Sequence, residues 1–142
     1  MRTFYKNHKE KLELLKSGKL GLVENVKHFL KNIENQKDLN AFNFVFNDET
    51  IESAKTVEQK IKNNSVGKLA GMVIAIKDVL AFKDHPLTCS SNILKNFASL
   101  YTATAVQKLI DEDAIIIGKT NCDEFAMGSS NENSAFGNVL NP

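Results

Sequence analysis

Hydrophobic positions in the first part of the chain recur at the spacing of an α-helix. In residues 3–16 and again in residues 20–34, large apolar side chains return every three or four positions, and a serine–glycine pair follows the first run. A third run over residues 48–62 has the same period, and Asp48 is suited to cap its start. We therefore predict three amphipathic helices that pack one face against an apolar surface.

Three short apolar stretches have the pattern of β-strands. Phenylalanine recurs at every second position over residues 41–46, which is the period of a strand. Residues 72–76 and 114–117 are apolar throughout, as is typical of parallel strands that are covered on both faces. Between these two stretches, Thr102 or Thr104 can cap a further helix, so the second half of the chain predicts a β-α-β unit.

The order of these elements predicts an α/β fold, with N-terminal helices followed by the first strands of a mixed sheet that is flanked by helices. Near residue 68 the sequence changes from an amphipathic pattern to nearly continuous apolar runs. We therefore divide the chain into residues 1–68, a helical region with one short strand, and residues 69–142, the start of an α/β core. Because the two later strands are expected to run parallel, Lys77 and Lys119 at their carboxyl ends should open on one edge of the sheet, where ligands bind in such folds.

Composition and charge exclude several classes of protein. The 142 residues are 42% hydrophobic and 25% charged, which suits one globular domain with a real core. Seventeen of the eighteen basic residues are lysine, so the forked contacts of arginine that read bases are nearly absent. Two cysteines without a CxxC pair argue against a zinc site or a disulfide framework. With no apolar run near 18 residues and no signal core, we expect a cytoplasmic protein without membrane association.

Lys77 ends the apolar run of residues 71–78 and allows two interpretations. In the simpler one, its charge emerges into solvent at the edge of the sheet, because lysine is seldom fully buried. In the other, the lysine lies in a desolvated cleft, where burial favours the neutral amine and lets it act as general base toward a hydroxyl. The second interpretation requires a nucleophilic hydroxyl nearby.

Two further motifs have simple explanations. Residues 118–120 (Gly-Lys-Thr) resemble the end of a phosphate-binding loop, but the residues before them are strand-like and lack the required glycine. We interpret this lysine as a residue at a strand end before a helix cap. Asp84, His85, Ser90 and Ser91 supply the residue types of a catalytic triad, yet no nucleophile elbow surrounds either serine. We expect these four residues to lie in a solvated loop.

Small and hydrogen-bonding residues dominate residues 127–137, which predicts a loop just beyond the carboxyl edge of the sheet. Before this loop, residues 122–127 are expected to form a short helix that Asn121 caps and Gly128 ends. The position of the loop makes it a candidate wall for a small polar ligand.

Taken together, these motifs resemble the amidase signature family in order and spacing. The motifs that carry the resemblance lie at residues 67–78, 87–91, 102–106, 118–121 and 123–130. The last of them, Asp-Glu-Phe-Ala-Met-Gly-Ser-Ser, is typical of the branch of the family that is linked to tRNA. The likeness extends to Pro142. Departures are minor: Val73 stands where proline is usual, and Val79 stands where asparagine is common.

The resemblance implies an amidase fold and a Ser-cisSer-Lys triad. In that triad Lys77 works through a bridging serine to activate a nucleophilic serine, which attacks a carboxamide and forms an acyl-enzyme. The resemblance also implies four substrate-binding residues in the acyl pocket, namely Met127, Gly128, Ser129 and Ser130. In the family both serines and the oxyanion loop follow the segment that matches Asn141 and Pro142. We therefore expect this chain to be roughly the first third of the enzyme, and to be inactive alone.

For the whole enzyme, the resemblance implies a glutaminase that supplies ammonia to convert Glu-tRNA(Gln) or Asp-tRNA(Asn) to the amidated form. The implied partners are amidotransferase subunits B and C, which bind the aminoacyl-tRNA and use ATP and Mg²⁺, while the glutaminase itself takes no cofactor and no metal. Two alternatives stay open, a general amidase of the same family and a non-catalytic fragment that binds a partner. Because a sheet that stops after its first strands exposes edges, we expect the chain alone to be sticky or partly ordered.

Overall fold

The computed structural model describes residues 5–142, and it confirms the predicted α/β class. Its helices are α1 (His8–Lys16), α2 (Leu22–Asn35), α3 (Asn47–Lys62) and α4 (Thr104–Asp111). Its strands are β1 (Phe42–Val45), β2 (Val73–Lys77) and β3 (Ile115–Thr120), and two short 3₁₀ turns are η1 (Lys37–Leu39) and η2 (Glu124–Ala126). Residues 3 and 4 of the first predicted helix lie outside the described residues. Within them, Asn7 caps α1 by accepting a hydrogen bond from the Glu10 amide at 3.0 Å.

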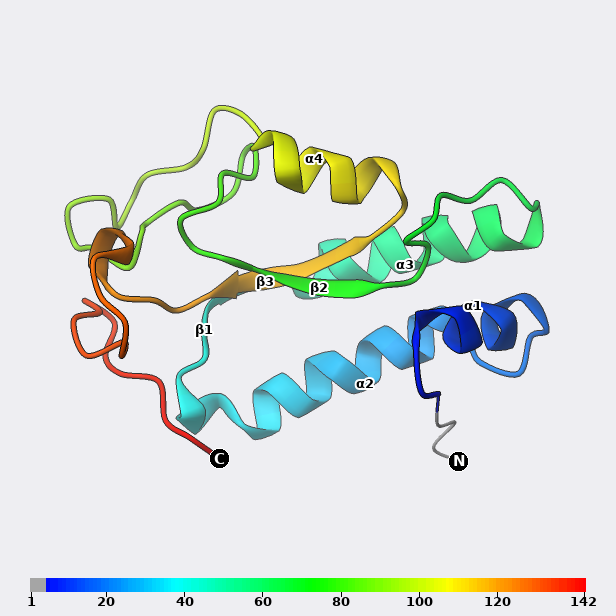
Figure 1. The fold of residues 1–142 in the computed structure, drawn as a ribbon, viewed down its shortest axis with the longest axis horizontal. Coiled ribbons are helices and arrows are strands. Elements are labelled where there is room, and N and C mark those ends of the chain that lie inside the picture. Colours follow the sequence, from blue (N-terminus) through cyan, green and yellow to red (C-terminus); the bar gives the residue numbers. More distant parts are fainter. Residues whose placement is uncertain (1–4) are drawn as a thin grey trace.

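The three strands form one mixed sheet in the order β1-β3-β2. Strand β2 runs parallel to β3 and is joined to it through α4, so the predicted β-α-β unit is confirmed. Strand β1 pairs with the other edge of β3 in the antiparallel direction. The register pairs Ile76 with Lys119 and Lys77 with Thr120. Both strands therefore end at one edge of the sheet, on the left in Figure 1, as predicted.

Helices cover the sheet from both sides, which gives three layers (Figure 1). Ile115 and Ile117 of β3 pack into the larger apolar cluster, together with buried residues of α1, α2 and α3. Ile116 points to the other side and packs with Val106 of α4 and Ile76 of β2. The alternation of a strand thus supplies both faces of β3 with core contacts. The larger cluster draws on both sides of residue 68, and the division of the chain there stays a proposal.

Strand β2 differs from the prediction that both of its faces are covered. It forms an edge of the three-stranded sheet, and Ala75 and Lys77 are exposed, while β3 in the centre is buried as predicted. The pattern of apolar residues could not separate an edge strand from a central one, because both carry continuous apolar runs. None of the helices in the described residues is long and apolar enough to cross a membrane.

Two predicted helix caps and the extent of one predicted helix are wrong. Asp48 lies in the first turn of α3, after Phe46, where its charge still suits the positive end of the helix. Ala103 precedes α4 instead of a threonine cap, and the Thr102 hydroxyl accepts a hydrogen bond from the Lys83 amide. The predicted helix over residues 122–127 is only a 3₁₀ turn, because Phe125 adopts a left-handed conformation with φ of 52° that cannot continue a helix.

Candidate functional site

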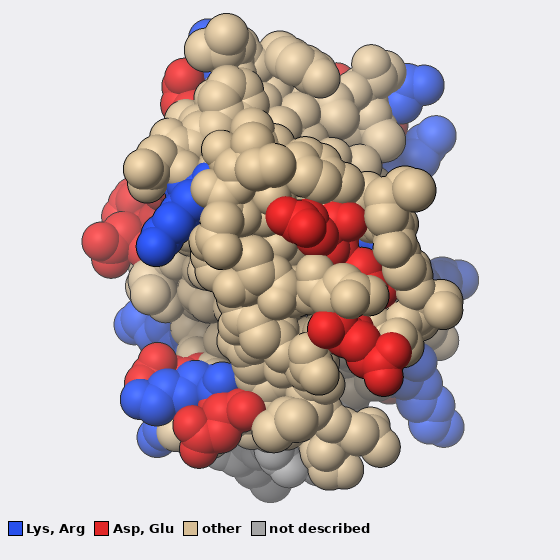
Figure 2. Space-filling view, turned by 90° about the vertical axis from the view of Figure 1, so that its left-hand side faces the viewer, with Lys and Arg blue, Asp and Glu red and all other residues tan. Residues whose placement is uncertain are grey.

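The candidate site is built on the edge where β2 and β3 end. Lys77 is the last residue of β2, and its side chain is exposed. Two main-chain hydrogen bonds hold the chain just after it: Leu80 donates to the Lys77 carbonyl at 2.9 Å, and Asp78 donates to the Thr120 carbonyl at 3.1 Å. Figure 2 faces this edge, which is covered mainly by uncharged side chains with a few acidic and basic groups among them.

Asp78, directly after Lys77, is fully buried and organises the loops behind this edge. Its carboxylate accepts hydrogen bonds from the Asn43 side chain at 2.9 Å, from the Thr88 amide at 3.3 Å and from the Thr88 hydroxyl. The Lys119 ammonium lies 3.9 Å from the same carboxylate. A buried carboxylate needs such partners, because an unpaired charge in the interior is strongly disfavoured.

Lys119 is buried just as completely, which the sequence did not indicate. Its ammonium donates to the Leu80 carbonyl at 2.5 Å, and its whole side chain is enclosed. Burial lowers the pKa of Lys119, while the nearby Asp78 opposes that shift by favouring the charged form. Lys119 lies at the carboxyl end of β3, as expected, one residue before the last. Only the parallel register, which sets Lys119 beside Ile76 and close to Asp78, brings the two charges together.

Ser90 and Ser91 are buried, so the expectation of a solvated loop is wrong for them. The Ser90 hydroxyl accepts from the Asn43 side chain at 2.9 Å and from the Cys122 amide at 3.1 Å. The Ser91 hydroxyl donates to Glu124 at 2.5 Å. A row of polar residues usually indicates a surface loop. Here each serine hydroxyl forms a hydrogen bond with a distant segment of the chain, which allows the serine to be buried.

His85 does not complete a catalytic triad with these serines. Its Nε2 lies 2.5 Å from the Glu49 carboxylate, and its Nδ1 lies 2.7 Å from the Lys83 carbonyl. The imidazole also stacks on the Phe82 ring, with 3.9 Å between the ring centres. The histidine therefore links the loop after β2 to α3, and the rejection of a triad on sequence grounds agrees with these contacts.

The loop that carries the predicted substrate-binding residues is held by one carboxylate. Asp123 accepts hydrogen bonds from the amides of Asn131 at 2.9 Å and Asn133 at 3.0 Å. These amide hydrogen bonds, with Asn133 the strongest, lower the pKa of Asp123. Gly128 lies against the carboxylate, so that a Cβ there would come within 2.4 Å of the Asp123 Cγ. Sequence reasoning had assigned Asp123 only a place in a helix.

Met127, Gly128, Ser129 and Ser130 are exposed in this loop, with 82% of the Met127 surface accessible. In the described residues no hydrogen bond joins them to Lys77. The two parts are connected indirectly, because Phe125 donates to the Cys89 carbonyl at 2.9 Å and Cys89 donates to the Asp78 carbonyl at 3.1 Å. The roles of Lys77 and of these four residues stay predictions.

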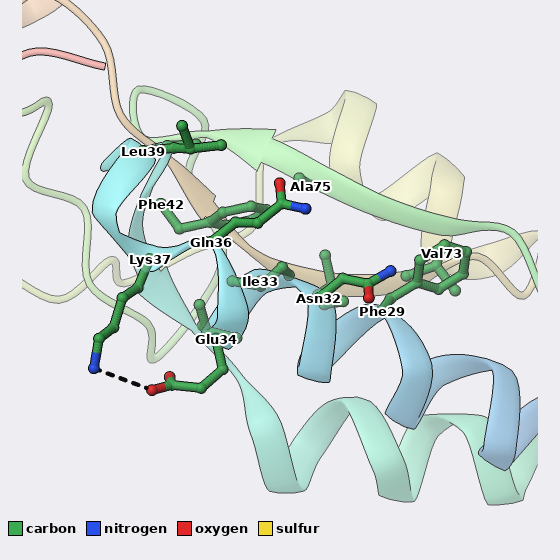
Figure 3. A pocket seen from close by; sticks show the side chains of 13 residues that line it. Phe29, Asn32, Ile33, Glu34, Gln36, Lys37, Leu39, Phe42, Val73 and Ala75 are labelled. Carbon is green, nitrogen blue, oxygen red and sulfur yellow. Dashed lines mark hydrogen bonds and ion pairs between the residues drawn. The ribbon is translucent and has the colours of Figure 1, made fainter. Parts of the chain in front are cut away.

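A groove lies elsewhere, between α2 and the exposed face of β2 (Figure 3). It has a volume of about 390 Å³, and its walls are mostly apolar, with Phe29 and Ile33 of α2 opposite Val73 and Ala75. Lys77 does not line it. In the described part of the chain, no three His, Cys, Asp or Glu side chains gather as a metal site would require. Because Lys77 does not line this groove, we place the candidate site at the edge of the sheet.

Comparisons with known proteins bear on the family of the chain and on its fold. The family model described as Amidase matches residues 24–142. The A subunit of a glutamyl-tRNA(Gln) amidotransferase from Pelodictyon phaeoclathratiforme is 54% identical over 120 residues, which cover 84% of this chain and 25% of that protein. The same protein from Chlorobium chlorochromatii is 47% identical over 137 residues, or 96% of this chain and 29% of the relative. The chain thus spans about a quarter of the length of these curated relatives.

Solved structures give the same result for the fold. A protein from a study of the origins of an s-triazine catabolic enzyme superposes with a TM-score of 0.89 at 25% identity, covering 96% of this chain and 31% of that one. The A subunit of the glutamyl-tRNA(Gln) amidotransferase from Thermotoga maritima superposes with a TM-score of 0.69 at 32% identity, covering 93% and 26%. Because the family model covers most of its residues, the chain belongs to the amidase family.

Proposed function

We propose that this chain is the amino-terminal part of the glutamine-hydrolysing component of an amidotransferase, and that Lys77 is its proton acceptor. The whole enzyme would release ammonia from glutamine and deliver it to form Gln-tRNA(Gln) or Asn-tRNA(Asn). The observation that carries the proposal is the position of Lys77 at the carboxyl edge of the sheet, next to the buried carboxylate of Asp78. The similarity of the chain to amidotransferase relatives supports it.

In this proposal the Lys77 amine takes a proton, through a bridging serine, from a serine that attacks the glutamine carboxamide. Ammonia leaves, and water then hydrolyses the acyl-enzyme. Both serines would come from polypeptide that follows this segment in the whole enzyme. Lys77 is exposed, and a covering segment would desolvate its amine and favour the neutral, proton-accepting form. Met127, Gly128, Ser129 and Ser130 would form the wall of the acyl pocket.

Subunits B and C are the partners in this proposal. They would bind the aminoacyl-tRNA and use ATP and Mg²⁺ to activate it, while the glutaminase component itself takes no cofactor. The tRNA-linked sequence motif at residues 123–130 and the names of the amidotransferase relatives support this assignment.

A general amidase of the same family is the second candidate. It is favoured by the superposition on a bacterial aryl acylamidase of the amidase signature family, which has a TM-score of 0.77 at 30% identity, against 0.69 for the Thermotoga maritima protein. The two candidates differ in their dependence on partners. Ammonia release from glutamine that requires subunits B and C supports the amidotransferase, and release of ammonia from other amides without them supports the general amidase.

The role of Lys77 is tested in the complete enzyme by Lys77→Ala. Loss of the proton acceptor is expected to lower kcat for glutamine hydrolysis by about 10³-fold or more. Lys95→Ala is the matched control, because Lys95 is also an exposed lysine on a loop and should keep full activity. Turnover that survives Lys77→Ala would refute the proposal. The 142-residue chain alone is expected to show no glutaminase activity, because it would lack both serines.

A further inference from the structure

We infer that Lys119 is a positioning residue for the proposed reaction, because its buried ammonium fixes the main-chain turn from which Lys77 projects. The inference rests on the proposed function of Lys77 and adds a second lysine to it. Lys119 is assigned no contact with substrate and acts through the backbone.

The burial of Lys119 and Asp78 requires an explanation beyond stability. Both side chains are 0% exposed, although charged groups are seldom enclosed unless they are paired. Their separation of 3.9 Å is longer than a direct hydrogen bond. Buried ion pairs are weak evidence for stability, because apolar residues of similar volume often serve as well. What the Lys119 ammonium does contact directly is a main-chain carbonyl, that of Leu80, at 2.5 Å.

That carbonyl belongs to the turn directly after Lys77. The Leu80 amide donates to the Lys77 carbonyl at 2.9 Å, so Leu80 closes the turn and Lys119 fixes the closed turn to β3. The Asp78 amide adds a second tie to β3, through the Thr120 carbonyl at 3.1 Å. The main chain on the carboxyl side of Lys77 is therefore anchored twice to the central strand. Without the ammonium, the turn would keep only one of these ties.

Alternation along β2 separates the two amines. Ile76 is buried against Val106 of α4, and Asp78 is buried as well, whereas Lys77, between them, is exposed. Lys119 pairs with Ile76 in the register and reaches the Asp78 side. Its charge thus lies across the sheet from the Lys77 side chain. Removal of Lys119 should therefore change where the Lys77 amine lies without removing any direct contact between the two amines.

The test uses the complete enzyme with its partner subunits and compares the variant Lys119→Met with wild type. Displacement of a catalytic group by about 1 Å costs on the order of 10²-fold in rate, so we expect kcat to fall about 10- to 100-fold. KM for glutamine should stay within about twofold, because the binding loop is not altered. The midpoint of the pH profile of kcat should not move.

A matched control is Lys60→Met, which removes another lysine that bonds an aspartate, Asp113, at 2.6 Å. That pair lies away from the β2 turn and should leave kcat unchanged. If Lys119→Met does not fold, the double variant Lys119→Met with Asp78→Asn is used instead. It removes both charges of the buried pair, so that no unpaired charge is left in the interior. Faster hydrogen exchange of the Leu80 amide, with the Ile115 amide at the other end of β3 unchanged, would show that the turn has been released.

The outcomes separate the inference from the proposed function. An enzyme that loses turnover after Lys77→Ala but keeps it in the folded Lys119 variants overturns only the positioning role. A shifted pH midpoint also overturns it, because Lys119 would then act on the reacting groups directly. An enzyme that keeps turnover after Lys77→Ala overturns the proposed function, and the positioning role with it.

Discussion

Lys11 shows how strongly the surroundings of a single amine control its charge. Only 4% of its surface is exposed, and its ammonium lies 5.3 Å from the centre of the Tyr5 ring and 5.5 Å from that of Phe29. The faces of aromatic rings attract a cation, but they replace only part of the lost hydration. Burial consequently lowers the pKa of Lys11 to about 8 from an ordinary value of 10.5.

We predict that Lys11 titrates near pH 8 when its side-chain amine is followed by NMR. Because the unfolded chain holds this proton up to about pH 10.5, wild-type stability should rise as the pH increases between these two values. Lys11→Met should therefore stabilise the fold at pH 7 by about 1–2 kcal/mol, a value reduced from the full shift for solvent screening. The gain should shrink above pH 8. A Lys11 titration near 10.5 would contradict this account.

Asp123 gives a second prediction at this scale. Asp123→Asn should release the loop over residues 127–134, because a neutral amide accepts the hydrogen bonds of Asn131 and Asn133 less strongly. Hydrogen exchange of those two amides should become roughly tenfold faster. Asp38→Asn, at an exposed aspartate in the turn after α2, is the control and should change neither rate.

The pH dependence of the same loop follows from the lowered pKa of Asp123. Its ionised carboxylate should hold the loop at all pH values above the ordinary 3.8 of an unfolded aspartate. That contribution is lost as the pH falls through the lower folded value. Loop amides that lose protection already near neutral pH would show that another group holds the loop.

Among the secondary-structure elements, β3 is the central strand, and the other two strands pair with it. It pairs with β1 and β2, packs against helices on both faces, and carries Lys119. Gly118 sits where the pairing is closest, because a Cβ there would lie 2.3 Å from the Phe44 carbonyl oxygen and 3.2 Å from the Val45 Cα. Backbone atoms cannot move aside as a flexible side chain can. This position requires glycine for close approach and not for its dihedral angles.

Gly118→Ala should therefore separate β1 from β3 and destabilise the fold by about 1–3 kcal/mol, the range of overpacked interior sites. Gly21→Ala is the matched control, because the nearest atom to a Cβ at Gly21 is 3.9 Å away, and alanine at this N-cap costs only about 0.5–1 kcal/mol. Denaturant unfolding of both variants gives the comparison. Equal unfolding midpoints of the two variants would contradict the close approach of β1 to β3 at Gly118.

The whole molecule leaves apolar surface uncovered. The groove between α2 and β2 is open (Figure 3), and β2 presents a free edge. Two apolar side chains of the loop before α4, Ile93 and Leu100, are each 80% exposed. Unpaired strand edges and contiguous apolar patches promote association with other chains.

We predict that the 142-residue chain, purified alone, self-associates and unfolds over a broad temperature range. Light scattering after size-exclusion chromatography and a thermal melt measure the two properties. A double substitution, Ile93→Lys with Leu100→Lys, should reduce the association without altering the helix content. A monomer with one sharp, cooperative melt would show that the exposed surfaces are harmless.

Particular residues show what local pattern was able to predict. Ala54, Val57 and Ile61 recur at helical spacing, and they form the buried seam of α3, because helical periodicity alone decides which side chains share a face. The continuous apolar run of β3 likewise predicted a strand covered on both faces. The order of these elements sufficed for the α/β class and for the shared edge at Lys77. The motifs pointed to the family that the comparisons then confirmed.

Other properties depend on contacts between distant segments. The burial of Ser90, the enclosure of Lys119 beside Asp78 and the hydrogen bonds of Asp123 to its loop each need partners that lie 8 to 47 positions away in the chain. A side chain's charge state and exposure follow from the sum of its neighbours, and those neighbours are brought together only by strand register and loop packing. The sequence alone therefore determined the elements, their faces and the family. The tertiary structure decided which polar residues are buried and which backbone they hold in place.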